Sequence, residues 1–252
     1  MRSLGCAIGV AALLLAAAPR SWSGGQEAKE ARALLDKAIQ AHGGEAKLAK
    51  AKAVYFRGSG HVRVGGDFPM TAELHAQGTT HMKFVADVNV NGMNIRLIKV
   101  INGDKGWNKI GDGAADAINA EELAEDRLMI YLIHLASLTP LKDKAYTLSP
   151  LGEAKVGDKA AVGLRISREG FRDVSLYFDK TSHLLLKSEI NVKDGGNEVL
   201  QEIYYSGHKL IDGVQHAHKW SAKRDGKPFV DVEFTEITVH QQKLDDSIFA
   251  KP

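Results

Sequence analysis

The chain of 252 residues carries 33 Lys and Arg against 31 Asp and Glu, a formal net charge of +2 with neutral histidines. This balance excludes the strongly basic surface of a general nucleic-acid-binding protein. Cys6 is the single cysteine, which also excludes an intramolecular disulfide framework.

The first residues have the features of an export signal. Arg2 supplies a positive charge, residues 7–18 supply an apolar run, and small residues around Ser23 favour cleavage there. At about a dozen residues, the run is too short to span a bilayer, which needs roughly 20. Cys6 lies before the apolar run, on the wrong side for a lipidated cysteine. We therefore expect a signal peptide at 1–23, export across the inner membrane to the periplasm, and a mature chain without cysteine.

Residues 24–252 are expected to form one domain. Roughly 230 residues is within the size of single all-β sandwiches and barrels, and no linker or repeat divides the chain. The mature chain opens with a predicted helix over residues 27–40, which ends at His42-Gly43-Gly44. The helix is amphipathic because its apolar residues recur at helical spacing. They are Ala31, Leu34, Leu35, Ala38 and Ile39.

Apolar and polar residues alternate from Val54 onward, as in strands with one buried face. Gly58 and Gly60 take apolar positions in the first strand, which predicts a bend or a close approach by another element. Turn signals separate the strands and suit tight hairpins, so the pattern predicts a meandering antiparallel sheet. The turns are Gly65-Gly66-Asp67, Asn91-Gly92, Asn102-Gly103-Asp104, Gly157-Asp158, Asp194-Gly195-Gly196, Asp212-Gly213 and Asp225-Gly226.

Residues 120–138 break the strand pattern. Three glutamates at the start favour a helix N-terminus, a dense apolar run follows over residues 128–135, and Pro140 ends the segment. A helix that is apolar on nearly every side must be buried on several sides. We therefore expect this helix to plug the concave face of a strongly curved sheet.

His208, His216 and His218 form the densest histidine group, and His216 and His218 share a face if they lie on a strand. Zinc needs a third and usually a fourth ligand, and the chain has no recognised metal-binding spacing. Surface residues around Asp212-Gly213 are the favoured interpretation, and a metal-dependent enzyme is the less favoured alternative. Because no nucleophile elbow or phosphate-binding loop occurs either, we expect no catalytic residue, metal or cofactor.

Methionine and aromatic side chains are plentiful on the predicted apolar faces. Each can simply fill the core, but one-faced curved strands under an apolar helix can also leave a cavity. Methionine adapts to irregular apolar surfaces, including those of ligands. Strand phase predicts a hydrophobic cavity with Trp107 at its rim. The predicted lining residues are Phe56, Met82, Phe84, Trp107, Met129, Phe178 and Leu186.

Several segments resemble the LolA-like superfamily of periplasmic lipoprotein carriers and receptors. They are Ala33-Leu34-Leu35-Asp36-Lys37-Ala38-Ile39 with Gly43-Gly44, Gly103-Asp104-Lys105-Gly106-Trp107, and Leu176-Tyr177-Phe178-Asp179-Lys180 leading into Leu184-Leu185-Leu186-Lys187. The resemblance implies a mainly β fold with α elements, a half-open antiparallel β-barrel with helices covering the concave face. It also implies that this face receives acyl chains or other lipids. Arg57 and Arg63 both fall in the polar phase, so neither matches the carrier's lid arginine.

We therefore expect a monomeric, non-enzymatic periplasmic carrier for lipid, lipoprotein acyl chains or another hydrophobic ligand. Movement of residues 120–138 would admit and release the ligand. The alternative on the same fold is an envelope sensor or protein-interaction module, which would bind an envelope protein without bound lipid.

Overall fold

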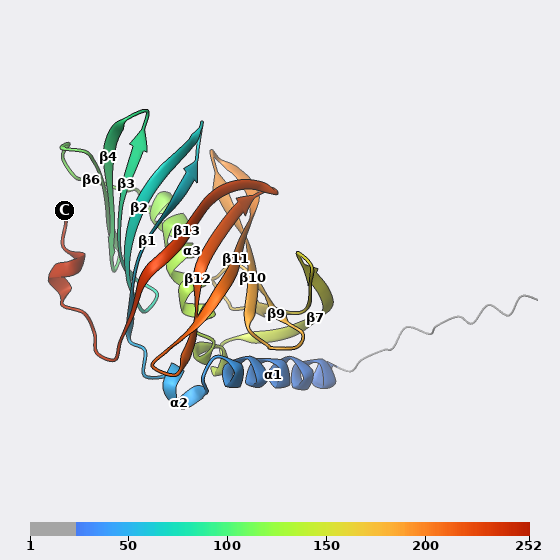
Figure 1. The fold of residues 1–252 in the computed structure, drawn as a ribbon. Coiled ribbons are helices and arrows are strands. Elements are labelled where there is room, and N and C mark those ends of the chain that lie inside the picture. The colour runs from blue at the N-terminus through green and yellow to red at the C-terminus, as the bar shows by residue number, and fades with distance from the viewer. Residues whose placement is uncertain (1–23) are drawn as a thin grey trace, which may run out of the picture.

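The computed structural model describes residues 24–252 (Figure 1). The expected signal peptide, its cleavage after Ser23, and Cys6 lie outside this range. Among residues 24–252, no helix is both long and apolar enough to cross a bilayer.

Helices and strands confirm the order expected from the sequence. The helices are α1 (Gly24–Ala41), α2 (Glu45–Leu48) and α3 (Ala120–Ala136), with 3₁₀ turns at Thr139–Lys142 and Asp246–Phe249. The strands are β1 (Ala53–Arg63), β2 (Asp67–Gln77), β3 (His81–Val90), β4 (Met93–Asn102), β5 (Lys105–Ile110), β6 (Asp116–Ala117), β7 (Thr147–Val156), β8 (Lys159–Ser167), β9 (Val174–Asp179), β10 (Leu185–Asp194), β11 (Asn197–Ile211), β12 (Val214–Arg224) and β13 (Lys227–His240). Every turn predicted from the sequence falls between two of these strands.

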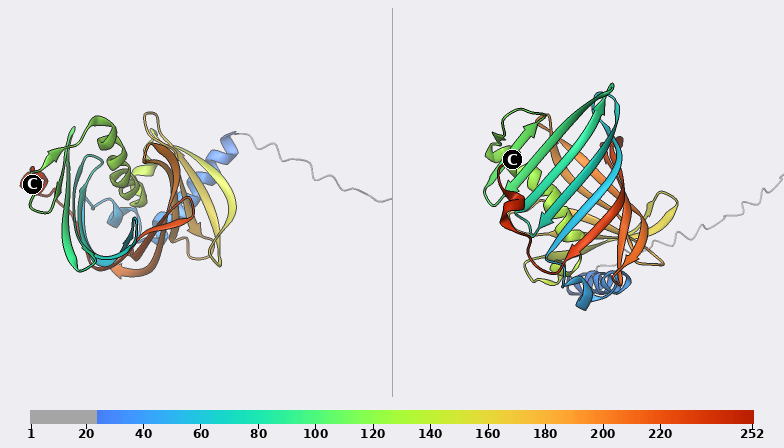
Figure 2. Two further views of the ribbon diagram at one scale, coloured as in Figure 1. Left: turned by 90° about the horizontal axis from the view of Figure 1, so that it is seen from above. Right: turned by 60° about the vertical axis from the view of Figure 1, so that its left-hand side comes forward.

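The strands form one antiparallel sheet of 13 strands in the order β6-β5-β4-β3-β2-β1-β13-β12-β11-β10-β9-β8-β7. The sheet curls around α3, as both views in Figure 2 show. Because β6 and β7 lie at opposite edges and do not pair, the barrel stays open. The predicted half-open antiparallel barrel with helices on its concave face is therefore confirmed.

One long crossover sets the topology. The chain meanders from β1 to β6, crosses the concave face as α3, and meanders back from β7 until β13 pairs with β1. The side-chain oxygen of Asn119 accepts a 2.9 Å hydrogen bond from the Glu122 N–H and so caps the helix. The predicted plug is confirmed, since α3 buries side chains toward both halves of the sheet.

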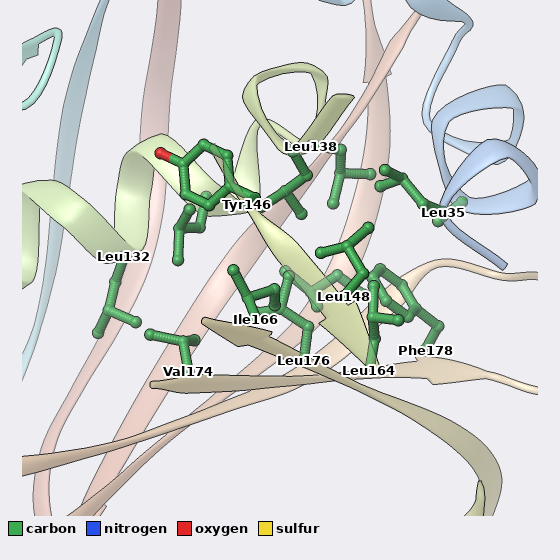
Figure 3. Packing of buried hydrophobic residues seen from close by; sticks show 14 of the residues in the cluster. Leu35, Leu132, Leu138, Tyr146, Leu148, Leu164, Ile166, Val174, Leu176 and Phe178 are labelled. Atoms are coloured by element: carbon green, nitrogen blue, oxygen red, sulfur yellow. The ribbon is translucent and has the colours of Figure 1, made fainter. Parts of the chain in front are cut away.

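Two apolar clusters lie against α3. One is built by α1, α3 and the strands from β7 onward (Figure 3). Its fully buried members include Leu35, Leu132, Leu138, Leu164 and Phe178. The other joins α3 to the first strands and β13. Its buried members are Phe56, Leu74, Met82, Ile101, Leu123, Ile130, Phe234 and Ile237.

Two glycines let β1 approach β13 closely. A Cβ at Gly58 would collide with the Glu233 carbonyl oxygen, and a Cβ at Gly60 with that of Asp231. The register between the strands also shifts after Arg57, which marks a β-bulge and increases the local twist. The close approach expected at Gly58 and Gly60 is confirmed.

Gly60→Ala should therefore lower the free energy of unfolding by about 1–3 kcal/mol, because the added methyl group must displace β13. Urea unfolding followed by circular dichroism measures the change. Gly25→Ala in α1 is the control, since its new Cβ meets nothing within 4 Å. Equal stability of Gly60→Ala and wild type would contradict the close approach.

Candidate functional site

A cavity of about 290 Å³ lies between α3, the α1–α2 segment and the concave face of the sheet. It comes close to the lower end of the size range of ligand sites. Its apolar lining consists of Leu48, Ala51, Val54, Phe56, Met129, Leu132, Ile133, Ala136, Leu185, Ile203, Ile211, Val214, Ala217, Trp220 and Val239. Its polar lining consists of His42, Lys47, Lys50, Ser137, Tyr205, His208, Asp212, Gln215, His216 and Gln241.

Aromatic rings form the inner end of the cavity. The ring of Trp220 lies 5.0 Å from that of Phe56 and 4.9 Å from that of Phe234, in tilted and edge-on contacts. Tyr205 meets Trp220 edge-on at 5.7 Å, and its hydroxyl lies 2.9 Å from the Ser188 hydroxyl. Burial raises the pKa of Tyr205 to about 12, so the phenol stays neutral. This end can contact an apolar group but offers no charge.

The opposite end of the cavity lies where the α1–α2 segment meets the β11–β12 turn. The backbone N–H of Gln215 donates to the His42 carbonyl oxygen at 3.0 Å. Gly43 has a positive φ of 124°, and a Cβ there would collide with the Gly213 carbonyl oxygen. The two turn motifs, far apart in sequence, therefore pack directly against each other.

His42 fixes this junction through both ring nitrogens. Its Nδ1 lies 2.8 Å from the Ala38 carbonyl oxygen, and its Nε2 accepts a 3.3 Å hydrogen bond from the Leu185 N–H. These partners assign the neutral tautomer with the proton on Nδ1. Burial lowers the pKa of His42, and the bond to Ala38 opposes this only in part. His42 therefore joins α1 to β10.

His208 and His216 complete the rim of the cavity. The ring of His208 lies 6.2 Å from that of His42, edge-on. Burial, together with a smaller contribution from neighbouring imidazoles, lowers the pKa of both His208 and His216 to about 4. Both rings are therefore neutral at pH 7. The Nε2 atom of His216 is buried and has no hydrogen-bond partner in residues 24–252.

Gly207 explains how β11 directs His208 into the cavity. In a regular strand, Tyr205 and His208 would point to opposite faces because they are three residues apart. Gly207 has a positive φ of 63°, which breaks the alternation between them. As a result both side chains line the cavity.

The helix α3 forms one wall and is held at its N-terminal half by charge. Asp126 pairs with Lys99 of β4, and Glu125 binds Arg172, just before β9, with two contacts of 2.5 and 3.2 Å. These pairs tie the helix to both halves of the sheet. The C-terminal half contributes the apolar lining residues Met129, Leu132, Ile133 and Ala136.

Two of the predicted lining residues, Phe56 and Met129, line this cavity. Phe56 extends from β1 and Met129 from α3. Met82 lies deeper, in the same buried cluster as Phe56, and Phe84 packs partly buried beside it. Trp107 is half-buried on β5, opposite Ala117 of β6.

The structure packs Phe178 and Leu186 elsewhere. Phe178 is fully buried in the cluster of Figure 3, and Leu186 belongs to a small cluster with Val156 and Ala161. Neither these two nor Met82, Phe84 and Trp107 are among the lining residues of the cavity. For these five residues, contact with a ligand stays a prediction.

The histidines expected at the surface are instead partly or fully buried, so that expectation is wrong. His218 is only 8% exposed, and its Nδ1 lies 3.2 Å from the Phe234 carbonyl oxygen. The neighbour of His208 at the rim is His42, which the sequence does not single out as a site residue. In the part of the chain that the structure describes, no three His, Cys, Asp or Glu side chains are placed to hold a metal ion.

Solved structures share this fold. A DUF1329 family protein from Desulfovibrio piger is similar with a TM-score of 0.54 and 14% identity, over 87% of this chain and 97% of that one. A LolA superfamily protein from Nitrosomonas europaea has a TM-score of 0.53 and 13% identity, over 88% of this chain and 97% of that one. An outer membrane lipoprotein-sorting protein domain from Vibrio parahaemolyticus has a TM-score of 0.52 and 11% identity, over 89% of this chain and 97% of that one. No protein-family model and no curated protein matches the sequence. The chain has a LolA-like fold.

Acid should destabilise the protein through the rim histidines. The pKa of His208 and His216 is about 4 in the folded chain, against 6.5 for an ordinary imidazole. The unfolded chain therefore binds more protons between these values, and the free energy of unfolding should fall as the pH falls from 6.5 to 4. Chemical denaturation at a series of pH values measures this slope.

The double variant His208→Asn/His216→Asn should have a shallower slope over the same pH range. His61→Asn is the control, because His61 is exposed on β1. A slope unchanged in the double variant would show that other groups cause the pH dependence.

Proposed function

We propose that this protein is a non-enzymatic carrier that binds an acyl chain of a lipid or lipoprotein in the cavity beside α3. The observation that carries the proposal is the cavity itself, about 290 Å³ with a mainly apolar lining. Burial of an acyl chain there is favourable by about 0.8 kcal/mol per methylene group. The LolA-like fold supports the same proposal, since one similar structure is a lipoprotein-sorting protein domain.

The carrier acts in the periplasm as a monomer, after export through the N-terminal signal. Movement of α3 admits and releases the chain. The helix is suited to this role because its apolar C-terminal half forms a wall, while ion pairs at Glu125 and Asp126 hold the other half. Opening separates the C-terminal half from its apolar neighbours, while the polar anchors at Glu125 and Asp126 stay in place.

Trp220 provides a direct test because its indole lines the cavity. A Trp107→Phe background leaves Trp220 as the single tryptophan of residues 24–252. Addition of 9,10-dibromostearate should quench its fluorescence more strongly than stearate does, because bromine quenches indole only at close range. Equal fluorescence with both fatty acids would contradict an acyl chain in the cavity.

Ala217→Phe should weaken stearate binding by about a hundredfold, because the added ring takes the space of three or four methylene groups. Displacement of a fluorescent fatty acid measures the dissociation constant. Ser221→Phe is the matched control, since Ser221 is an exposed residue of the same strand and does not line the cavity. Similar affinities for both variants would place the binding site elsewhere.

A further inference from the structure

The cavity has an apolar end and a polar end. Trp220 lies at the apolar end, whereas His208, His216, Lys47 and Lys50 lie at the polar end. On β12, His216 and Trp220 are four residues apart, a distance of about 13 Å along a strand. A ligand that fills this cavity therefore has one end among aromatic rings and the other among nitrogen donors.

The imidazole of His216 at the polar end is not fully used by the fold. The Nε2 atom of His216 is buried without a hydrogen-bond partner in residues 24–252. Leaving a buried polar atom unsatisfied costs about 1–3 kcal/mol. A ligand oxygen can accept a hydrogen bond from an imidazole N–H there and remove this cost. His42 is already occupied, since both of its ring nitrogens have backbone partners.

The lysines give the polar end a surplus of positive charge. Lys47 donates a 3.4 Å hydrogen bond to the Gly213 carbonyl oxygen, and neither Lys47 nor Lys50 pairs with a carboxylate among the described residues. Of the residues that line the cavity in this part of the chain, Asp212 is the single acid. Two cations and two imidazoles against one carboxylate favour an anionic group.

We infer that the ligand is an amphiphile with an anionic head group, whose carboxylate or phosphate binds His208 and His216 at the rim and whose apolar chain points toward Trp220. This inference rests on the proposed function and adds the chemical class of the ligand. Hydrogen bonds to a charged group are stronger than those to a neutral one. Selection for the anion therefore occurs at the rim, while the apolar end contributes affinity for the chain.

The test compares ligands of equal chain length at pH 8, where fatty acids are ionised. Laurate should bind wild-type protein about tenfold more tightly than 1-dodecanol, because only laurate presents a charged acceptor. Lauroyl lysophosphatidylglycerol separates the two sources of the anion. If it shares the preference over dodecanol, the rim accepts a phosphate as well, and if laurate alone shows it, the head group is a free carboxylate. Equal binding of dodecanol and both anions overturns the inference.

His208→Asn/His216→Asn should reduce the preference for laurate over dodecanol to near unity and leave dodecanol binding unchanged. His61→Asn is the control, because His61 is exposed on β1 and does not line the cavity, and this variant should keep the preference for laurate. A preference that survives in the double variant overturns the role of the two imidazoles. Failure of both laurate and dodecanol to bind wild type contradicts the proposed carrier function itself, which distinguishes the two failures.

A second measurement leaves His208 and His216 unsubstituted. In the Trp107→Phe background, 11-bromoundecanoate carries bromine at the chain end and 2-bromoundecanoate carries it beside the carboxylate. The first should quench Trp220 more strongly than the second at equal occupancy. The opposite order, or equal quenching, would mean that the head group is not held at His208 and His216.

Discussion

The C-terminal half of α3 is apolar on nearly every side and must be buried, and the rest of the structure is arranged around this constraint. Its burial requires sheet on both sides, which the curled strands provide. The crossover that contains α3 joins β6 at one edge of the sheet to β7 at the other, and these two edge strands do not pair. One cluster packs solidly against the helix, while its C-terminal half and the strands beyond leave a cavity. The burial of α3 inside the sheet therefore accounts both for the open barrel and for the cavity within it.

Much of the fold can be predicted from local patterns. Three of these patterns each depend on a short stretch of chain: the alternation along strands, the turn dipeptides, and the acidic start of residues 120–138. The structure has the matching hairpins and helix. Gly58 and Gly60 also indicate the close approach of β13, because a glycine in an apolar phase leaves room for a backbone. The LolA-like fold itself is implied by the resemblance of short segments to that superfamily, and the structure has it.

The site is harder to predict because it depends on contacts between distant segments. Phe56 and Met129 reach the cavity as strand and helix phase suggest, but Phe178 has the same inward phase and packs in the solid core. The alternation along a strand predicts which face of the sheet a side chain points to. It does not predict whether that side chain lies beside the cavity or in the packed core. His42 enters the site only because Gly43 lets α1 meet the β11–β12 turn, and His208 only because Gly207 breaks the alternation. The paired glycine turns are the signals that point to this junction.

Native mass spectrometry of the purified protein tests the central claim most directly. The account predicts one bound amphiphile per chain, released by organic extraction and absent from the Ala217→Phe variant. A folded wild-type protein that carries no small molecule, and takes up neither fatty acid nor lipopeptide, would contradict the carrier. It would favour an envelope sensor that binds a protein on the same fold.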